Sequence, residues 1–141
     1  MDIKKALRQI RSGRFEEKEI KRHREALERK RLAGGAGYDK EKVLTSPSDK
    51  IADITAEIDA IDEKLRDHSE RILAKESACL DAITQVEESI YRRILMLRYI
   101  DDEPKSWMEI AYTIGYSEVH TKKMHGLALK EARKHWKDDT L

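Results

Sequence analysis

The feature that most constrains the fold of this chain is a set of apolar residues at seven-residue spacing. Its members are Ile51, Ile58, Leu65, Ile72, Cys79 and Val86. A second series, offset by three residues and weakening along the chain, consists of Ile54, Ile61, His68, Lys75 and Ala82. Neither Gly nor Pro interrupts residues 48–103, so the pattern predicts one long helix over 47–90 and excludes a strand, which needs period two. A helix of that length needs a partner along its apolar seam.

The first 32 residues supply a candidate partner. Apolar residues on one helical face occur at Ile3, Leu7 and Ile10, and a seven-residue spacing resumes at Ile20 and Leu27. The pattern predicts a helix over 2–32, kinked or broken at Ser12-Gly13, and a glycine-rich linker over 33–46 that reverses the chain. An antiparallel, coiled-coil-like hairpin would then bring together residues whose numbers sum to about 79.

The start of the long helix carries its own signals. Ser46 is a candidate N-cap, Pro47 suits the first helical position, and Asp49 favours the first turn. Ser48 is an alternative cap.

Charge is distributed unevenly along the chain. The net charge is only +1, although 40% of the residues are charged. Residues 1–32 carry 12 basic and 6 acidic side chains, whereas residues 47–90 carry 5 basic and 12 acidic ones. These opposite charges favour pairing of the two helices. The alternative that the basic residues of the first helix bind nucleic acid phosphates remains open.

The apolar residues from Cys79 to Ile90 extend beyond the predicted reach of the first helix. They must pack on the C-terminal part of the chain or on a second copy of the protein. We therefore expect a homodimer through the long helix, with coverage within one chain as the alternative.

The C-terminal third shows the order of elements typical of a helix-turn-helix. Residues 106–109 read Ser-Trp-Met-Glu, an S-x-x-E capping box that opens a short helix. Gly115 suits a left-handed position after that helix, and Ser117 can cap a final helix that reaches about His135. The sequence thus predicts an all-α protein, with a helical hairpin over 1–90 and a helix-turn-helix domain over 91–141.

Other kinds of chemistry find little support in the sequence. One cysteine, Cys79, can form neither an internal disulfide nor a cysteine-rich zinc site, which favours an intracellular protein. The chain has no apolar run long enough to span a membrane and no signal peptide at its start. We find no catalytic constellation and no metal-ligand spacing. We therefore predict no enzyme, no cofactor, no small-molecule substrate and no membrane partner.

The C-terminal motifs also carry a family resemblance. Its residues are Leu97-Arg98-Tyr99-Ile100, Ser106 to Ala111, Ile114 to Ser117 and Met124 to Leu129. Together they resemble the fourth region of bacterial sigma factors and, more closely, small phage transcriptional regulators of the RinA/ArpU kind. The resemblance covers residues 91–134. It implies a transcriptional regulator, an activator of late or packaging genes of a phage or mobile element. It also implies a cytoplasmic, nucleoid-associated protein that binds double-stranded DNA and has RNA polymerase as a further candidate partner.

The resemblance assigns roles within the last helix, about 117–135. Buried positions fall on Thr121, Met124, Ala128 and Ala132. Positions facing the major groove fall on Glu118, Val119, His120, Lys122 and Lys123. Candidate contacts to the DNA backbone are His125, Lys130, Arg133 and Lys134, with Ser106 and Ser117 at helix N-termini.

Two departures from the family pattern bear on these roles. Thr121 stands where an aliphatic residue is usual, and the acidic turn of residues 101–103 would repel phosphate near DNA.

Two rival functions also remain. One is a phage DNA-packaging protein of the small-terminase kind, which predicts a closed ring. The other is an interaction module that acts on RNA polymerase without binding DNA.

Overall fold

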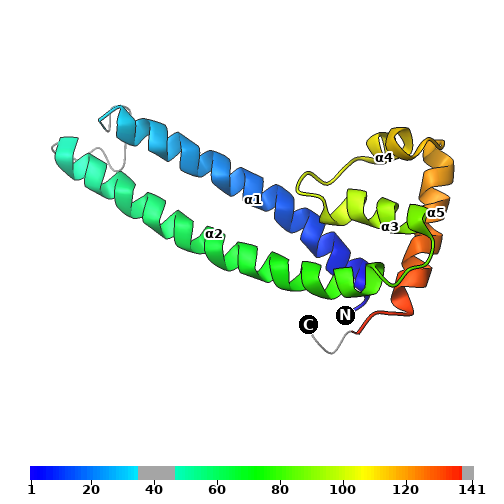
Figure 1. Ribbon diagram of the computed structural model, residues 1–141. Helices are drawn as coiled ribbons and strands as arrows, with labels where there is room; N and C mark the ends of the chain where they lie inside the picture. Colours follow the sequence, from blue (N-terminus) through cyan, green and yellow to red (C-terminus); the bar gives the residue numbers. More distant parts are fainter. Residues whose placement is uncertain (35–46, 138–141) are drawn as a thin grey trace. The chain divides into compact units, whose positions relative to one another are not determined.

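The computed structural model describes residues 1–34 and 47–137, and helices make up all regular secondary structure in these residues. The elements are α1 (Ile3–Leu32), α2 (Pro47–Ile83), α3 (Ser89–Leu95), the π-helical segment η1 (Met96–Ile100), α4 (Trp107–Ile114) and α5 (Glu118–Arg133), shown in Figure 1. The predicted all-α class and the antiparallel hairpin of α1 and α2 are confirmed. By their contacts, the residues form two compact units, Met1–Phe15 with the chain from Glu70 onward, and Glu16–Ser69.

Helix α1 matches its predicted bounds but not its predicted interruption. It runs without a break through Ser12 and Gly13, so the expected kink or break there is wrong. A glycine inside a helix costs about 1 kcal/mol relative to alanine. Gly13 is buried, and the burial of Ile10 one turn earlier contributes more than that cost. Of the predicted linker, 35–46 lies outside the described residues.

Helix α2 begins at Pro47 with Asp49 in its first turn, as predicted, while the candidate cap Ser46 lies outside the described residues. The helix ends at Ile83, so the prediction of a helix to residue 90 is wrong. Thr84 Oγ1 donates to the Leu80 carbonyl at 2.8 Å, and Gln85 Nε2 donates to the Asp81 carbonyl at 2.7 Å. These bonds satisfy carbonyls at the end of the helix, so neither Gly nor Pro is needed there.

In the unit Glu16–Ser69, the hairpin is held by an apolar cluster and by charged pairs. Leu27 of α1 packs with Ile54 and Ile58 of α2. Arg24 Nε donates to Asp62 Oδ1 at 2.5 Å. The numbers of this pair sum to 86 rather than the predicted value of about 79. The difference is one heptad, which leaves the same apolar seam facing the partner, so periodicity alone could not choose between the two registers.

The unit formed by Met1–Phe15 and the chain from Glu70 contains the main core. Buried side chains meet there from the first turns of α1, the end of α2, the segment Leu95–Tyr99 and the second half of α5. They include Ile3, Ala6, Leu7, Ile10, Cys79, Ala82, Ile83, Val86, Ala128, Leu129 and Ala132. The apolar residues from Cys79 to Val86 are therefore buried against other parts of the same chain. Their burial no longer requires the homodimer that we predicted from them.

Burial in this core predicts a clear contrast between two Leu→Ala substitutions. Leu7 is 0% exposed, whereas Leu73 of α2 is 56% exposed. Leu7→Ala should lower the free energy of unfolding by about 2–5 kcal/mol, because it leaves a cavity. Leu73→Ala should change it by less than about 0.5 kcal/mol. Urea unfolding followed by circular dichroism measures both, and equal losses would contradict the described core.

Candidate nucleic-acid interface

Local hydrogen bonds cap the start of α4 and the start of α5, and a glycine lies in the short turn between the two helices. Ser106 Oγ accepts from the Glu109 backbone N–H at 3.2 Å, and Glu109 Oε1 accepts from the Ser106 N–H at 3.1 Å. Gly115 has φ +79°, the left-handed conformation that glycine tolerates best. Ser117 Oγ accepts from the His120 N–H at 3.1 Å. The predicted capping box, glycine position and second cap are confirmed.

A small apolar core holds the two helices together. Ile94 of α3, Ile110 of α4 and Met124 of α5 are buried against one another. Thr121 is also fully buried, and its hydroxyl donates to the Ser117 carbonyl at 2.8 Å. That bond satisfies the hydroxyl group of Thr121 in the apolar interior. The four positions expected to be buried on α5 are all buried.

Most of the predicted DNA-contacting residues lie exposed along α5 or at the caps. The exposed ones are Ser106, Ser117, Glu118, Val119, His120, Lys122, Lys123, Lys130, Arg133 and Lys134. Val119 is 68% exposed. Lys122 lies 3.6 Å from Glu118 and Lys134 lies 3.0 Å from Glu131, both as exposed pairs that cost little to separate.

His125 differs from the other predicted contacts because its imidazole packs inside the unit. Its Nε2 lies 2.8 Å from the Tyr99 hydroxyl, within hydrogen-bond distance. Its ring meets the edge of Trp107 with centroids 4.6 Å apart. Burial, followed by the positive charges of Arg98, Lys4 and Arg8, lowers the pKa of His125 to about 4. A neutral, packed imidazole is a poor phosphate ligand, so we leave His125 out of the candidate contact surface.

Two arginines that the sequence analysis did not single out hold the segment before α4. Arg98 lies over the Trp107 ring, 4.3 Å from its centroid, and its Nη1 donates to the Lys105 carbonyl at 3.1 Å. Arg11 of α1 donates to the same carbonyl at 3.1 Å and to the Arg98 carbonyl at 2.9 Å. Burial lowers the pKa of both guanidinium groups. No sequence pattern predicts this contact, since it joins residues more than 85 positions apart.

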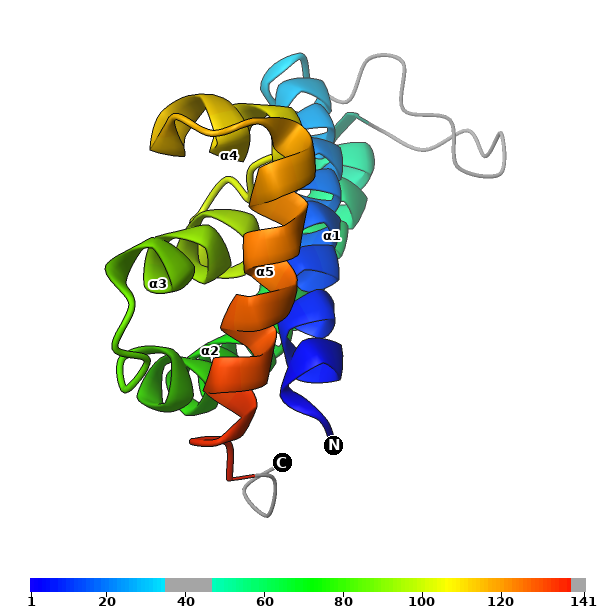
Figure 2. The same cartoon turned by 90° about the vertical axis from the view of Figure 1, so that its right-hand side faces the viewer.

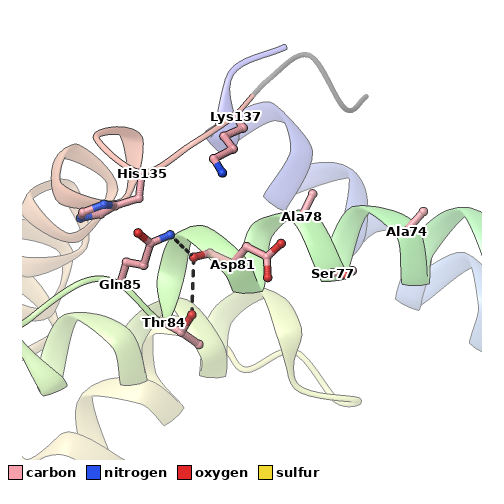
Figure 3. Close-up of a pocket in the computed structure, with 8 residues that line it drawn as sticks. All are labelled: Ala74, Ser77, Ala78, Asp81, Thr84, Gln85, His135 and Lys137. Atoms are coloured by element: carbon pink, nitrogen blue, oxygen red, sulfur yellow. Dashed lines mark hydrogen bonds between the residues drawn. The ribbon is translucent and has the colours of Figure 1, made fainter.

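The structure also contains a hollow that the sequence analysis did not indicate. A pocket of about 510 Å³ lies at the end of α2 and is lined also by His135 and Lys137 (Figure 3). Gln85 and Thr84 turn toward the Asp81 carbonyl in this view, so their polar groups are already used by the helix end.

Within the described residues, no three His, Cys, Asp or Glu side chains converge as a metal site requires. None of the helices described is long and apolar enough to cross a membrane.

Gly126, near the middle of α5, predicts a gain in stability on substitution. A Cβ added there meets no atom within 4 Å. Gly126→Ala should therefore raise the free energy of unfolding by about 0.5–1 kcal/mol. Gly115→Ala is the matched control and should lower it by about 1–2 kcal/mol, because its φ is +79°. Urea unfolding measures both changes. A lower free energy of unfolding for Gly126→Ala would contradict the open space described around Gly126.

The environment of His125 predicts a pH dependence of stability. The unfolded imidazole takes up a proton near pH 6.5, whereas the folded one does so only near its pKa of about 4. The unfolded state therefore binds more protons in this window, and the free energy of unfolding should fall as the pH drops from 6.5 to 4. His125→Gln, which keeps a hydrogen-bond acceptor for Tyr99, should show a smaller fall in urea unfolding. A difference between the two proteins that does not vary with pH would contradict the buried neutral imidazole.

Comparisons of the chain with protein-family models, with curated proteins and with solved structures found no match. The resemblance to sigma region four and to small phage regulators therefore rests on the residues quoted for it.

Proposed function

We propose that the protein binds double-stranded DNA with sequence preference through α4 and α5, with the N-terminal half of α5 in the major groove, and that it regulates transcription. One observation carries this proposal. A short capped helix, a left-handed glycine and a longer helix rest on a common apolar core, while the exposed side of the longer helix is basic. This is the arrangement by which helix-turn-helix proteins present side chains to base edges.

The exposed residues of α5 suit distinct kinds of contact. Lys122 and Lys123 can donate to guanine acceptors or to phosphates. Glu118, once separated from Lys122, can accept from a cytosine amino group, and Val119 can pack on a thymine methyl group. His120 lies on the same exposed part of the helix, with its ring centroid 5.1 Å from that of Tyr116.

Residues further along α5 suit contacts to the DNA backbone. Lys130 and Lys134 are exposed beyond the N-terminal half of the helix, where a recognition helix leaves the groove. The hydroxyl of Ser117 accepts from a backbone N–H and still has its own hydrogen to donate to a phosphate. These contacts position the protein without reading sequence.

A second candidate function is binding to a protein partner such as RNA polymerase. Met108 and Tyr112 lie one turn apart on α4 and are 72% and 88% exposed. Large apolar side chains exposed together favour a protein interface over a purely solvated surface. This candidate predicts a stable complex with polymerase and no shift of DNA at low salt.

The proposal predicts that Lys122→Ala combined with Lys123→Ala weakens DNA binding. Random-site selection of bound duplexes first supplies a preferred sequence, and fluorescence anisotropy then measures affinity across salt concentrations. Losing two contacts to DNA should weaken binding about tenfold or more and reduce the slope of log affinity against log salt by about 1 to 2.

The matched control is Lys30→Ala combined with Lys64→Ala, which removes the same charge from exposed positions on α1 and α2. This control should keep the wild-type slope. An unchanged slope for the α5 variant, or an equal loss in both variants, would show that α5 is not the DNA-contacting helix.

A further inference from the structure

We propose that the first turns of α1 form a second element of the DNA interface, in which Lys4 and Arg8 contact phosphates beside the groove that α5 occupies. This inference rests on the proposed function and extends the interface to residues outside the helix-turn-helix. It also distinguishes Lys4 and Arg8 from Arg14 and Arg24, which pair with carboxylates of α2.

The start of α1 lies next to the second half of α5 in both views, and α1 then leads away from α5 (Figure 1 and Figure 2). Arg133 Nε donates to Asp2 Oδ1 at 3.1 Å, and Trp136 Nε1 donates to the Met1 carbonyl at 2.7 Å. Ile3 and Leu129 belong to the same buried cluster. These contacts hold the first turns of α1 against the second half of α5.

Lys4 and Arg8 belong to these first turns of α1. They are one helical turn apart, so their side chains share a face. Both charges act on the imidazole of His125, in the middle of α5. Arg8 is exposed and Lys4 is half-buried, so a cation at this edge remains within reach of a ligand from solvent.

Lys4 and Arg8 differ from the arginines of α1 that pair with carboxylates of α2. Arg14 pairs with Glu76, and Arg24 pairs with Asp62, both on α2. Among the described residues, no carboxylate forms an ion pair with the side chain of Lys4 or Arg8. Uncompensated cations at the border of a basic helix favour a polyanion as their ligand.

The surface of α5 beside these cations is open. Gly126 follows His125, is exposed, and has no atom within 4 Å of the position of a Cβ. No internal packing therefore requires a glycine there, although glycine lowers helix stability. The missing side chain leaves the backbone of α5 accessible to a DNA strand at this point.

The experiment measures DNA affinity against salt concentration for Lys4→Ala combined with Arg8→Ala, on the duplex obtained by random-site selection. Loss of two phosphate contacts should reduce the slope of log affinity against log salt by about 1 to 2. Binding to random duplexes should weaken by the same factor as binding to the selected one, since phosphates carry no sequence information. The control Arg22→Ala combined with Arg29→Ala removes the same charge from exposed positions further along α1 and should keep the wild-type slope.

The outcomes separate this inference from the proposed function. If Lys122→Ala with Lys123→Ala weakens binding while the α1 variant keeps the wild-type slope, the α1 contact is overturned and the α5 interface stands. If the wild-type protein binds no duplex at low salt, both proposals fail. Circular dichroism melting verifies that each variant is folded, and Lys4→Gln with Arg8→Gln serves as the second variant if the alanine pair is unstable.

Discussion

The packing of the first turns of α1 against the second half of α5 is the contact on which the candidate interface depends. Ile3, Leu7 and Ile10 are fully buried there with residues from the end of α2. Because these side chains come from opposite ends of the chain, the C-terminal helices are not an independent appendage to a hairpin. The helix that we propose to read DNA is held in place by the N-terminus of the protein.

A second set of contacts extends this support toward α4 and the first half of α5. His125 is enclosed by Tyr99 and Trp107, and Arg98 lies over the same Trp107 ring. Arg11 joins α1 to the segment that precedes α4. A charge on His125 would stand beside the existing cations, so a neutral imidazole suits this position. Side chains that look like candidate DNA ligands in the sequence can thus be structural, since exposure depends on which helix packs alongside.

Local features of this fold could be predicted from the sequence, and long-range ones could not. The capping box at Ser106, the left-handed Gly115 and the cap at Ser117 follow from residue types within one turn. The end of α2 at Ile83 was missed because Thr84 and Gln85 close it with side-chain bonds rather than with Gly or Pro. The hairpin register was missed by one heptad, because both registers bury the same seam.

The same distinction between local and long-range features applies to the candidate site. The exposure of Lys122 and Lys123 follows from helical periodicity once the buried Thr121 and Met124 are known. The packing of the first turns of α1 against α5 follows from no periodicity, because it depends on which helices meet in three dimensions. Charge counts along the sequence therefore identified a basic first helix without showing which of its residues remain available.

The central claim is that DNA binds α5 together with the N-terminal turns of α1. Chemical-shift changes of backbone amides, recorded on adding the selected duplex, test it most directly because they map contacts along the whole chain. The account predicts the largest changes in residues 117–130 and 4–11, with little change in residues 16–32. Changes centred on the exposed side chains of α4, or on residues 16–69, would contradict it.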